Sequence, residues 1–315
     1  MRVLVTNDDG VESRGLHVLA RALVDTGLDV IVAAPDRDMS GSAAAIGQIH
    51  IDQEIEAEPI ELPDLAGVVA YAVDGPPGLC VLAARLGGFG QPPDLVVSGI
   101  NPGCNTGRAI LHSGTVGAAL TAANLGARGL AVSIDVTSLF TPGRAGRSRL
   151  PAGPTLPPGH PIDAGRGQEA VAEVVGDAET VAQVAPGERA DDPAHWATAA
   201  GAAVAAIDWL LAAPECTVIN VNVPNLPVAG LAGARHARLA PFGTVRSSVV
   251  ESAPGGGRLQ MELRPTGREM PADSDTGLVA QGFVAITPIV GPQADDRLDV
   301  GGLLEAVAVE ARRSA

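Results

Sequence analysis

Two hydrophobic patterns alternate through the first 135 residues of the chain. Short continuous apolar runs predict buried strands, and leucine and alanine residues at helical spacing predict the helices between them. The predicted strands cover residues 3–6, 30–34, 95–98 and 130–134, and the predicted helices cover residues 16–23 and 114–125. Strands that alternate with helices are typical of a mostly parallel sheet flanked by helices on both faces. The pattern therefore predicts an α/β fold.

The pattern changes after this region. Residues 136–192 are rich in proline, glycine and arginine, which predicts a flexible insertion with one short helix at residues 168–175. The regular pattern then resumes, with a helix expected at residues 196–211 and a strand at residues 217–223. Trp196 and Trp209 lie at helical spacing and are expected in the core.

The last part of the chain is expected to be rich in β-structure. Leu259, Met261 and Leu263 alternate with polar residues, which predicts an extended hairpin, and a helix is expected at residues 303–313. We therefore expect a main α/β domain at residues 1–235, including the flexible insertion at residues 136–192, and a β-hairpin extension with a C-terminal helix at residues 236–315.

Composition narrows the class of protein. The formal net charge of −15 argues against binding polymeric nucleic acid, because such a chain would release few counterions from phosphates. The chain has no lysine, which excludes Schiff-base and P-loop lysine chemistry. No apolar run is long enough to span a membrane, and no signal peptide is expected, because the chain enters its first predicted strand at residue 3. The three scattered cysteines suit a reducing compartment, so we expect a cytoplasmic protein without a membrane partner.

Two adjacent carboxylates follow the first predicted strand. The segment reads Asn7, Asp8, Asp9 and Gly10, at the edge of the sheet where α/β proteins bind ligands. Close like charges raise each other's pKa, and a hard divalent cation such as Mg²⁺ or Mn²⁺ relieves that repulsion. The alternative is that one of the aspartates caps the following helix.

Polar groups also follow the other predicted strands. Ser40 and Gly41 follow the second strand and offer a hydroxyl and backbone N–H groups, while Asn101 follows the strand at residues 95–98. Ser113 is placed to cap the helix at residues 114–125, whose free N–H groups and dipole favour a phosphate. These segments predict a hard-metal site beside a phosphate pocket.

In this order, the segments resemble the SurE family of survival-protein nucleotidases. The resemblance covers nearly the whole chain except residues 137–192, and Asp275 keeps the family's spacing from Gly282. The matching segments are N-D-D-G from residue 7, A-P-D-R-x-x-S-G from 34, P-D-L-V-V-S-G-I-N-x-G-x-N from 93, S-G-T-V-x-A-A from 113, I-N-V-N-V-P from 219 and G-F-V-A-I-T-P from 282.

The resemblance implies a Rossmann-like SurE fold and a metal-dependent phosphomonoesterase that acts on nucleoside 5′- or 3′-monophosphates. The family's metal ligands fall on Asp8, Asp9, Ser40 and Asn101, and its members form homodimers or homotetramers. Either aspartate can orient or deprotonate the attacking water. The residues expected to bind phosphate or substrate are Asn7, Gly41, Asn105, Arg108, His112, Ser113, Gly114 and Thr115.

The chain departs from the family pattern around the predicted metal ligands. Arg108 and Ala109 replace two acidic residues, His112 replaces a tyrosine, and Thr121 replaces a glutamate. Alanines replace polar residues at 43–45, and an aspartate before Cys80 is replaced by Leu79. Arg108 and His112 are either a new anion clamp or solvated loop residues.

These changes leave three alternatives to a nucleotide phosphatase. One is a specialised phosphatase of a phosphorylated secondary metabolite, and another is a catalytically weak nucleotide-binding protein. A third is a nucleotide-sugar transferase with acidic residues around Mn²⁺, which the Ser40 and Asn101 segments fit poorly. Chelator-sensitive phosphate release supports an enzyme, whereas tight binding without turnover supports a binding protein.

Overall fold

The computed structural model describes residues 1–47, 54–63, 65–136, 194–241, 245–251, 260–265 and 268–293. Its centre is a nine-stranded sheet in the order β3-β4-β2-β1-β5-β6-β7-β11-β8. All neighbours are parallel except the pairs β3–β4 and β7–β11. The strands are β1 (Arg2–Thr6), β2 (Asp29–Pro35), β3 (Ala57–Ile60), β4 (Val69–Val73), β5 (Leu95–Pro102), β6 (Arg128–Asp135), β7 (Val218–Pro224), β8 (Ala234–His236) and β11 (Val284–Ile289).

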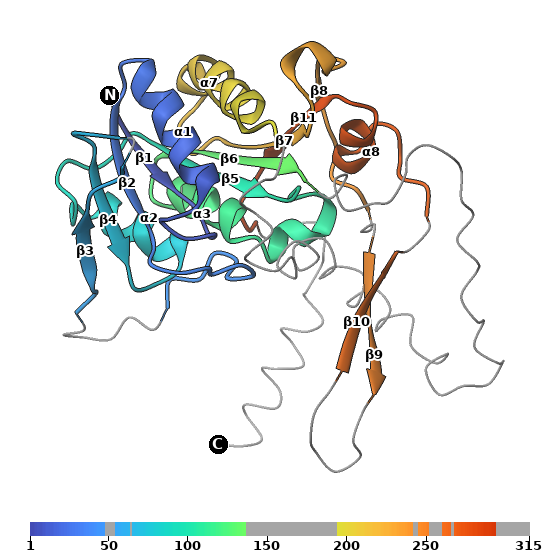
Figure 1. Ribbon diagram of the computed structural model, residues 1–315, viewed down its shortest axis with the longest axis horizontal. Helices are drawn as coiled ribbons and strands as arrows, with labels where there is room; N and C mark the ends of the chain where they lie inside the picture. Colours follow the sequence, from blue (N-terminus) through green and yellow to red (C-terminus); the bar gives the residue numbers. More distant parts are fainter. Residues whose placement is uncertain are drawn as a thin grey trace, which may run out of the picture.

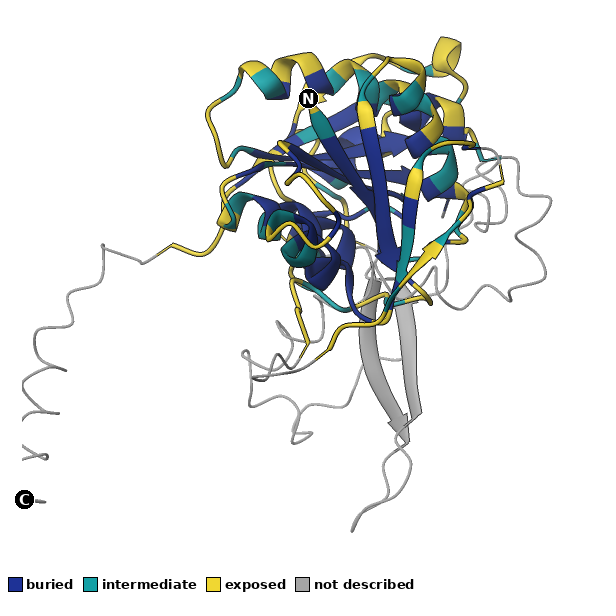
Figure 2. Ribbon diagram, turned by 90° about the vertical axis from the view of Figure 1, so that its left-hand side faces the viewer, coloured by how far each residue is buried: buried dark blue, intermediate teal, exposed yellow. Residues whose placement is uncertain are grey.

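Helices cover both faces of this sheet (Figure 1). Alternate residues of a strand point to opposite faces, so Val3 and Val5 pack in the cluster of α1 and α7, whereas Leu4 packs with α2 and α3. The central strands β1, β2, β5, β6 and β7 are mostly buried between these layers (Figure 2), whereas β3 and β8 at the two edges of the sheet are exposed or partly exposed. The helices are α1 (Arg14–Asp25), α2 (Pro77–Arg85), η1 (Gly107–Leu111), α3 (Gly114–Asn124), α7 (Trp196–Ala212), η4 (Val228–Gly230) and α8 (Asp275–Ala280).

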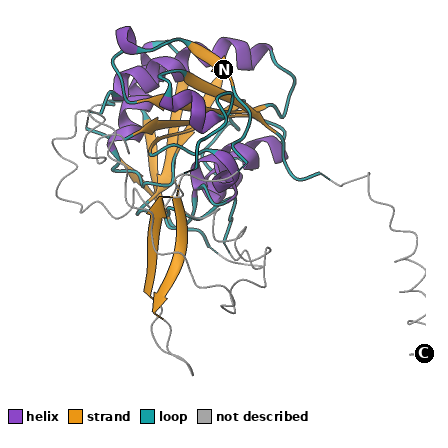
Figure 3. Cartoon of the chain, turned by 90° about the vertical axis from the view of Figure 1, so that its right-hand side faces the viewer, coloured by secondary structure: helices purple, strands orange, loops and turns teal. Residues whose placement is uncertain are grey.

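A separate two-stranded ribbon projects from this body (Figures 1 and 3). It consists of β9 (Val245–Glu251) and β10 (Gln260–Pro265), which pair antiparallel. The extended hairpin expected from the alternation at residues 259–263 is therefore confirmed over β10. After the ribbon, α8 and β11 bring the chain back, and β11 joins the main sheet beside β7.

The structure tests several further expectations. The predicted strands and helices of the first 135 residues are confirmed, as are α7 and β7. Trp196 is buried as expected, but the prediction for Trp209 is wrong, because its side chain is 58% exposed on the outer face of α7. The predicted insertion beyond Val136 and the helices at residues 168–175 and 303–313 lie outside the described residues.

Candidate active site at the carboxyl edge of the sheet

Asp8 lies at the centre of the site. Its side chain is buried at the end of β1, and the Thr115 hydroxyl donates a 2.5 Å hydrogen bond to its Oδ1 atom. Burial raises the pKa of this carboxyl, and the Asp38 carboxylate raises it further, while hydrogen bonds from the hydroxyl and backbone N–H of Thr115 oppose the shift. Thr115 is therefore a partner that fixes the orientation of Asp8.

Gly114 makes this arrangement possible. A Cβ atom at this position would lie 2.7 Å from Asp8 Cβ, 2.8 Å from Asp8 Oδ2 and 2.6 Å from Ser42 Oγ. The first turn of α3 can approach the carboxylate this closely only because residue 114 has no side chain. The expected cap of α3 is confirmed, since Ser113 Oγ accepts a hydrogen bond from the N–H of Val116 at 3.1 Å.

Asn101 lies beside Asp8. Its amide group donates to the carbonyl of Gly103 at 2.7 Å, which fixes the orientation of the amide. Its Oδ1 atom is 3.3 Å from the Thr115 hydroxyl that binds Asp8. The structure thus brings together two of the four predicted metal ligands, Asp8 and Asn101, around one threonine. Asp9 is the next residue on the same loop, and its Oδ2 atom is buried.

The loop after β2 carries Ser40 and Gly41, and both residues are exposed. The Ser40 hydroxyl donates to Asp38 Oδ1 at 2.6 Å, so the lone pairs of its oxygen remain able to bind a cation. The N–H of Met39 donates to the carbonyl of Asp8 at 2.7 Å, which joins this loop to the end of β1. Asp38 therefore belongs to the site, since it binds Ser40 and its charge acts on Asp8, although it is not among the residues expected there.

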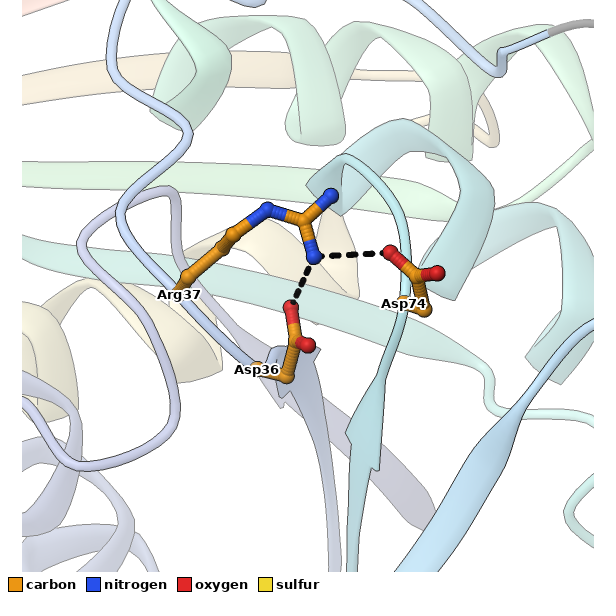
Figure 4. Close-up of polar contacts among 3 residues, drawn as sticks. All are labelled: Asp36, Arg37 and Asp74. Atoms are coloured by element: carbon orange, nitrogen blue, oxygen red, sulfur yellow. Dashed lines mark hydrogen bonds and ion pairs between the residues drawn. The ribbon is translucent and has the colours of Figure 1, made fainter.

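An arginine links this loop to the neighbouring strand β4 (Figure 4). Arg37 Nη1 lies 2.8 Å from Asp36 Oδ1 and 2.7 Å from Asp74 Oδ1, and all three side chains are roughly half exposed. The two carboxylates raise the pKa of the guanidinium, so it stays charged. On its other side, the Arg37 backbone packs against Gly10, where a Cβ atom would lie 3.1 Å from the Arg37 carbonyl carbon.

Asn7 stabilises the loop that carries Asp8 and Asp9. It is fully buried, and its amide nitrogen lies 3.1 Å from the carbonyl of Gly10 and 2.5 Å from Ser13 Oγ. Ser13, not an aspartate, occupies the N-cap of α1. The alternative that Asp8 or Asp9 caps this helix is therefore not supported. These contacts show that Asn7 stabilises the turn between β1 and α1. Its assignment as a substrate ligand stays a prediction.

Asn105 is also buried, and its polar groups bind within the protein. Its N–H donates to Asn222 Oδ1 at 2.8 Å, and its amide nitrogen donates to Ser133 Oγ at 2.9 Å. Its carbonyl accepts hydrogen bonds from the side chains of Asn220 and Asn222 at 2.7 and 2.9 Å. The residue thus attaches the segment after β5 to β6 and β7. Its predicted contact with substrate stays a prediction.

Asp275 fixes the next part of the same segment. The residue has no exposed surface, and its carboxylate accepts hydrogen bonds from the backbone N–H groups of Gly107, Ala240 and Thr276 at 2.8–3.0 Å. Burial raises its pKa, and these three hydrogen bonds oppose the shift. The resemblance identified its spacing, but only the structure shows that it holds the start of η1.

The two atypical residues Arg108 and His112 lie on and just after η1. Arg108 is exposed, and none of the ion pairs among the described residues includes it. His112 is half-buried, and its carbonyl accepts a hydrogen bond from the N–H of Ala43 at 3.2 Å. The segment after β5 therefore contacts the loop after β2 at this point.

The donor set fits a hard divalent cation. Asp8, Asp9, Ser40 and Asn101 offer only oxygen atoms, which Mg²⁺ and Mn²⁺ prefer. Asp8 Oδ2 faces Gly114, on the side away from the oxygen that Thr115 binds. Within the described part of the chain, no group of three histidine, cysteine, aspartate or glutamate residues is arranged to hold a metal. The neutral oxygen atoms of Ser40 and Asn101 are thus needed to complete the group of metal ligands.

The three cysteines are not among the predicted metal ligands. Burial raises the pKa of the Cys80 thiol to about 12, so it stays protonated and unreactive. Cys216 is exposed at the far end of α7, and Cys104 is partly buried.

The fold and the site define a Rossmann-like α/β protein with a cluster of oxygen donors at the carboxyl edge of its sheet. Residues 3–157 match the family model described as survival protein SurE. A 5′-nucleotidase SurE from Stenotrophomonas maltophilia (strain K279a) is 32% identical over 293 residues, which are 92% of this chain and 89% of that protein. A 5′-nucleotidase SurE from Xanthomonas campestris pv. campestris (strain B100) is 33% identical over the same shares. The chain belongs to the SurE family.

A solved structure agrees with the fold. The crystal structure of the SurE protein from Aquifex aeolicus matches with a TM-score of 0.65 and 24% sequence identity, and the match covers 98% of this chain and 100% of that one. The predicted Rossmann-like SurE fold is confirmed.

Proposed function

We propose that this protein is a divalent-metal-dependent phosphomonoesterase that hydrolyses nucleoside 5′- or 3′-monophosphates to nucleoside and phosphate. Its relatives are named 5′-nucleotidase SurE. The observation that carries the proposal is the buried Asp8 carboxylate, which Thr115 orients at the start of α3, with Asn101 beside it. Such a group of oxygen donors next to a helix N-terminus suits a cation and a phosphate together.

The chain's own residues have distinct parts in this reaction. Asp8, Asp9, Ser40 and Asn101 would hold Mg²⁺ or Mn²⁺, which polarises a phosphoryl oxygen when it is bound. Asp8 or Asp9 orients the attacking water and accepts its proton. Backbone N–H groups at Gly41 and Gly114 stabilise negative charge on the transferring phosphoryl group. Thr115 donates its hydroxyl proton to Asp8 and so keeps the carboxylate in position.

Arg108 and His112 are proposed to bind a negatively charged part of the substrate. The support is that Arg108 is exposed next to the site and pairs with no carboxylate among the described residues, in a chain with a net charge of −15. Guanidinium groups suit bidentate contacts with phosphate. The exposed Arg108 favours a second candidate function, a phosphatase of another phosphorylated metabolite. Activity on a panel of phosphomonoesters distinguishes this function from a nucleotide phosphatase.

The proposal is tested by phosphate release. The protein is incubated with nucleoside 5′- and 3′-monophosphates and with simple sugar phosphates, in the presence of Mg²⁺, Mn²⁺ or a chelator. We expect release that the chelator abolishes. Tight nucleotide binding without release would instead identify a binding protein, and activity that survives chelation would contradict the metal site.

Asp9→Ala should abolish turnover while the protein stays folded, because the residue lies on a loop outside the core. A lost metal ligand or base lowers the rate by at least about a hundredfold. The matched control is Asp208→Ala, which removes an exposed carboxylate from α7, and should leave activity unchanged. Full activity in the Asp9 variant would contradict the assignment, provided that both variants melt like the wild type.

We also propose that the protein is a homodimer or homotetramer that assembles through the β-hairpin and the residues after it. The support is that the β9–β10 ribbon projects from the body (Figure 3), since an isolated two-stranded ribbon has marginal stability in water. Light scattering at micromolar concentration tests this, and a monomer mass would refute it. No helix among the described residues is long and apolar enough to cross a membrane. The cytoplasmic location stays a prediction from cysteine usage.

A further inference from the structure

The Ser42 hydroxyl is a buried polar group without a hydrogen-bond partner among the residues that the structure describes. Its Oγ atom is buried, although the residue as a whole is partly exposed on the loop after β2. It is also the only polar side chain between Ser40 and Gln48, because glycine, alanine and isoleucine fill the other positions. A buried hydroxyl without a hydrogen bond is unfavourable, so its presence requires an explanation.

The hydroxyl lies on the same side of Gly114 as Asp8. A Cβ atom at Gly114 would lie 2.6 Å from Ser42 Oγ and 2.8 Å from Asp8 Oδ2. The serine hydroxyl and the carboxylate oxygen that Thr115 does not bind therefore both pack against the first residue of α3. The proposed function places the phosphoryl group beside this helix start, next to both oxygen atoms.

The backbone around Ser42 is fixed. The N–H of Ser42 donates to the carbonyl of Met39 at 3.1 Å, and the N–H of Ala43 donates to the carbonyl of His112 at 3.2 Å. Gly117 of α3 has no side chain where the Ala43 carbonyl approaches it. Ala43 has a φ angle of 52°, a left-handed conformation that residues with a side chain seldom adopt outside functional sites. The backbone that carries the hydroxyl is thus fixed by contacts within the protein.

We propose that Ser42 is a substrate ligand whose hydroxyl donates a hydrogen bond to a phosphoryl oxygen of the bound phosphomonoester. The proposal rests on the proposed function and adds a residue to its phosphate site. A neutral hydroxyl donor to a phosphate oxygen makes a charge-assisted hydrogen bond, and the bound phosphate supplies the partner that the folded protein lacks. Ser42 forms no covalent bond in this scheme.

The test compares Ser42→Ala with the wild type and with Thr121→Ala. The control removes a hydroxyl from α3, the helix whose first turn borders the site, and among the described residues this hydroxyl donates to the carbonyl of Gly117. Three quantities are measured: kcat/KM for a nucleoside monophosphate, the affinity for inorganic phosphate by calorimetry with Mg²⁺, and the melting temperature without ligand. A hydrogen bond to a charged group corresponds to a loss of about ten- to a hundredfold in kcat/KM and in phosphate affinity.

The melting temperature separates a ligand from a structural residue. Ser42→Ala removes a buried hydroxyl that has no partner, so it should melt at or above the wild-type temperature while it loses phosphate affinity. If the hydroxyl only stabilised the fold, the variant would melt below the wild-type temperature and would keep its phosphate affinity. The Mg²⁺ concentration for half-maximal activity should stay constant, and an increase would make Ser42 a cation ligand and overturn the proposal.

The same measurements separate this proposal from the proposed function. If the wild type is active and Ser42→Ala keeps the wild-type kcat/KM and phosphate affinity, Ser42 is not a ligand, although the phosphatase stands. If the wild type releases no phosphate from any ester but binds inorganic phosphate through Ser42, the phosphatase fails and the ligand assignment stands.

Discussion

The two segments that form the site are held by different kinds of interaction. The loop after β2 is exposed, and its ion pairs join Arg37 to Asp36 and Asp74 at the surface. The segment after β5 is buried over much of its length, and it is attached through Asn105 and through the Asp275 carboxylate. The loop after β2 thus combines backbone hydrogen bonds with exposed side-chain ion pairs, whereas the segment after β5 is also held by buried side-chain hydrogen bonds.

This difference indicates that the two segments have different roles in the site. Exposed ion pairs contribute about 0–1 kcal/mol and are screened by salt, whereas a buried acceptor that loses its donor costs about 1–3 kcal/mol. The segment after β5 and the start of α3 therefore set the position of Asp8. The loop after β2 carries Ser40 and Gly41 at the exposed side, where a cation and substrate can enter.

The largest expected effect comes from Gly114→Ala, at the point where the buried side touches the carboxylate. The new Cβ atom would lie within 2.8 Å of Asp8 Oδ2 and must displace the carboxylate or the helix start. Since a displacement of about 1 Å in an active site costs about a hundredfold in rate, kcat/KM should fall at least that far. Phosphate-release kinetics measure the effect.

The control for this variant is Gly201→Ala on α7, where a Cβ atom meets nothing within 4 Å. Alanine is favoured over glycine in a helix by about 1 kcal/mol, so this variant should be active and slightly more stable. Wild-type activity in Gly114→Ala would show that the close contact does not position Asp8.

A smaller effect is expected for Asp275→Asn. The carboxylate accepts hydrogen bonds from Gly107, Ala240 and Thr276, and either orientation of an asparagine amide points an NH₂ group at one of these N–H groups. The free energy of unfolding should fall by about 1–3 kcal/mol, measured by denaturant titration. Activity should fall too, because Gly107 begins the turn that leads to α3.

The exposed Asp273 provides the comparison. It lies two residues away, and its carboxylate is 69% exposed at 3.7 Å from Arg238. Asp273→Asn should therefore leave both stability and activity unchanged. Equal destabilisation by the two variants would show that burial of the Asp275 carboxylate does not matter, and the contrast between the two sides of the site would fail.

Much of this site could be predicted from the sequence, because its parts follow apolar runs. The strands β1, β2 and β5 are continuous apolar segments, and the polar residues after each of them meet at one edge of the sheet. Ser113 is recognisable as a cap from its place before a helical pattern, and its hydrogen bond to Val116 agrees. Local spacing is sufficient for features of this kind.

Other features depend on long-range contacts that the sequence does not display. Asn105 meets Asn220 and Asn222 more than a hundred residues away, so no local pattern distinguishes its structural contacts from those of a ligand. The helix α2 begins at Pro77 after a second proline, a pair typical of a loop, although proline is favoured in the first turn of a helix. On the alanine-rich α7, few polar residues mark the outer face, and this led to the wrong placement of Trp209.

The smallest expected effect belongs to Arg37→Gln on the exposed side. Its ion pairs to Asp36 and Asp74 are half exposed, so the melting temperature should not change measurably. The loop that carries Ser40 loses its link to β4, and the KM should rise modestly while kcat stays near the wild-type value. High salt should bring the wild type toward the variant, because salt screens exposed charges. Asp74→Asn should raise the KM to the same extent, and the Arg37→Gln and Asp74→Asn double variant should raise it little further.

A loss of activity or stability as large as that of Asp275→Asn would contradict the comparison. It would show that the loop after β2 and the segment after β5 are equally rigid, and that they do not have the different roles proposed above.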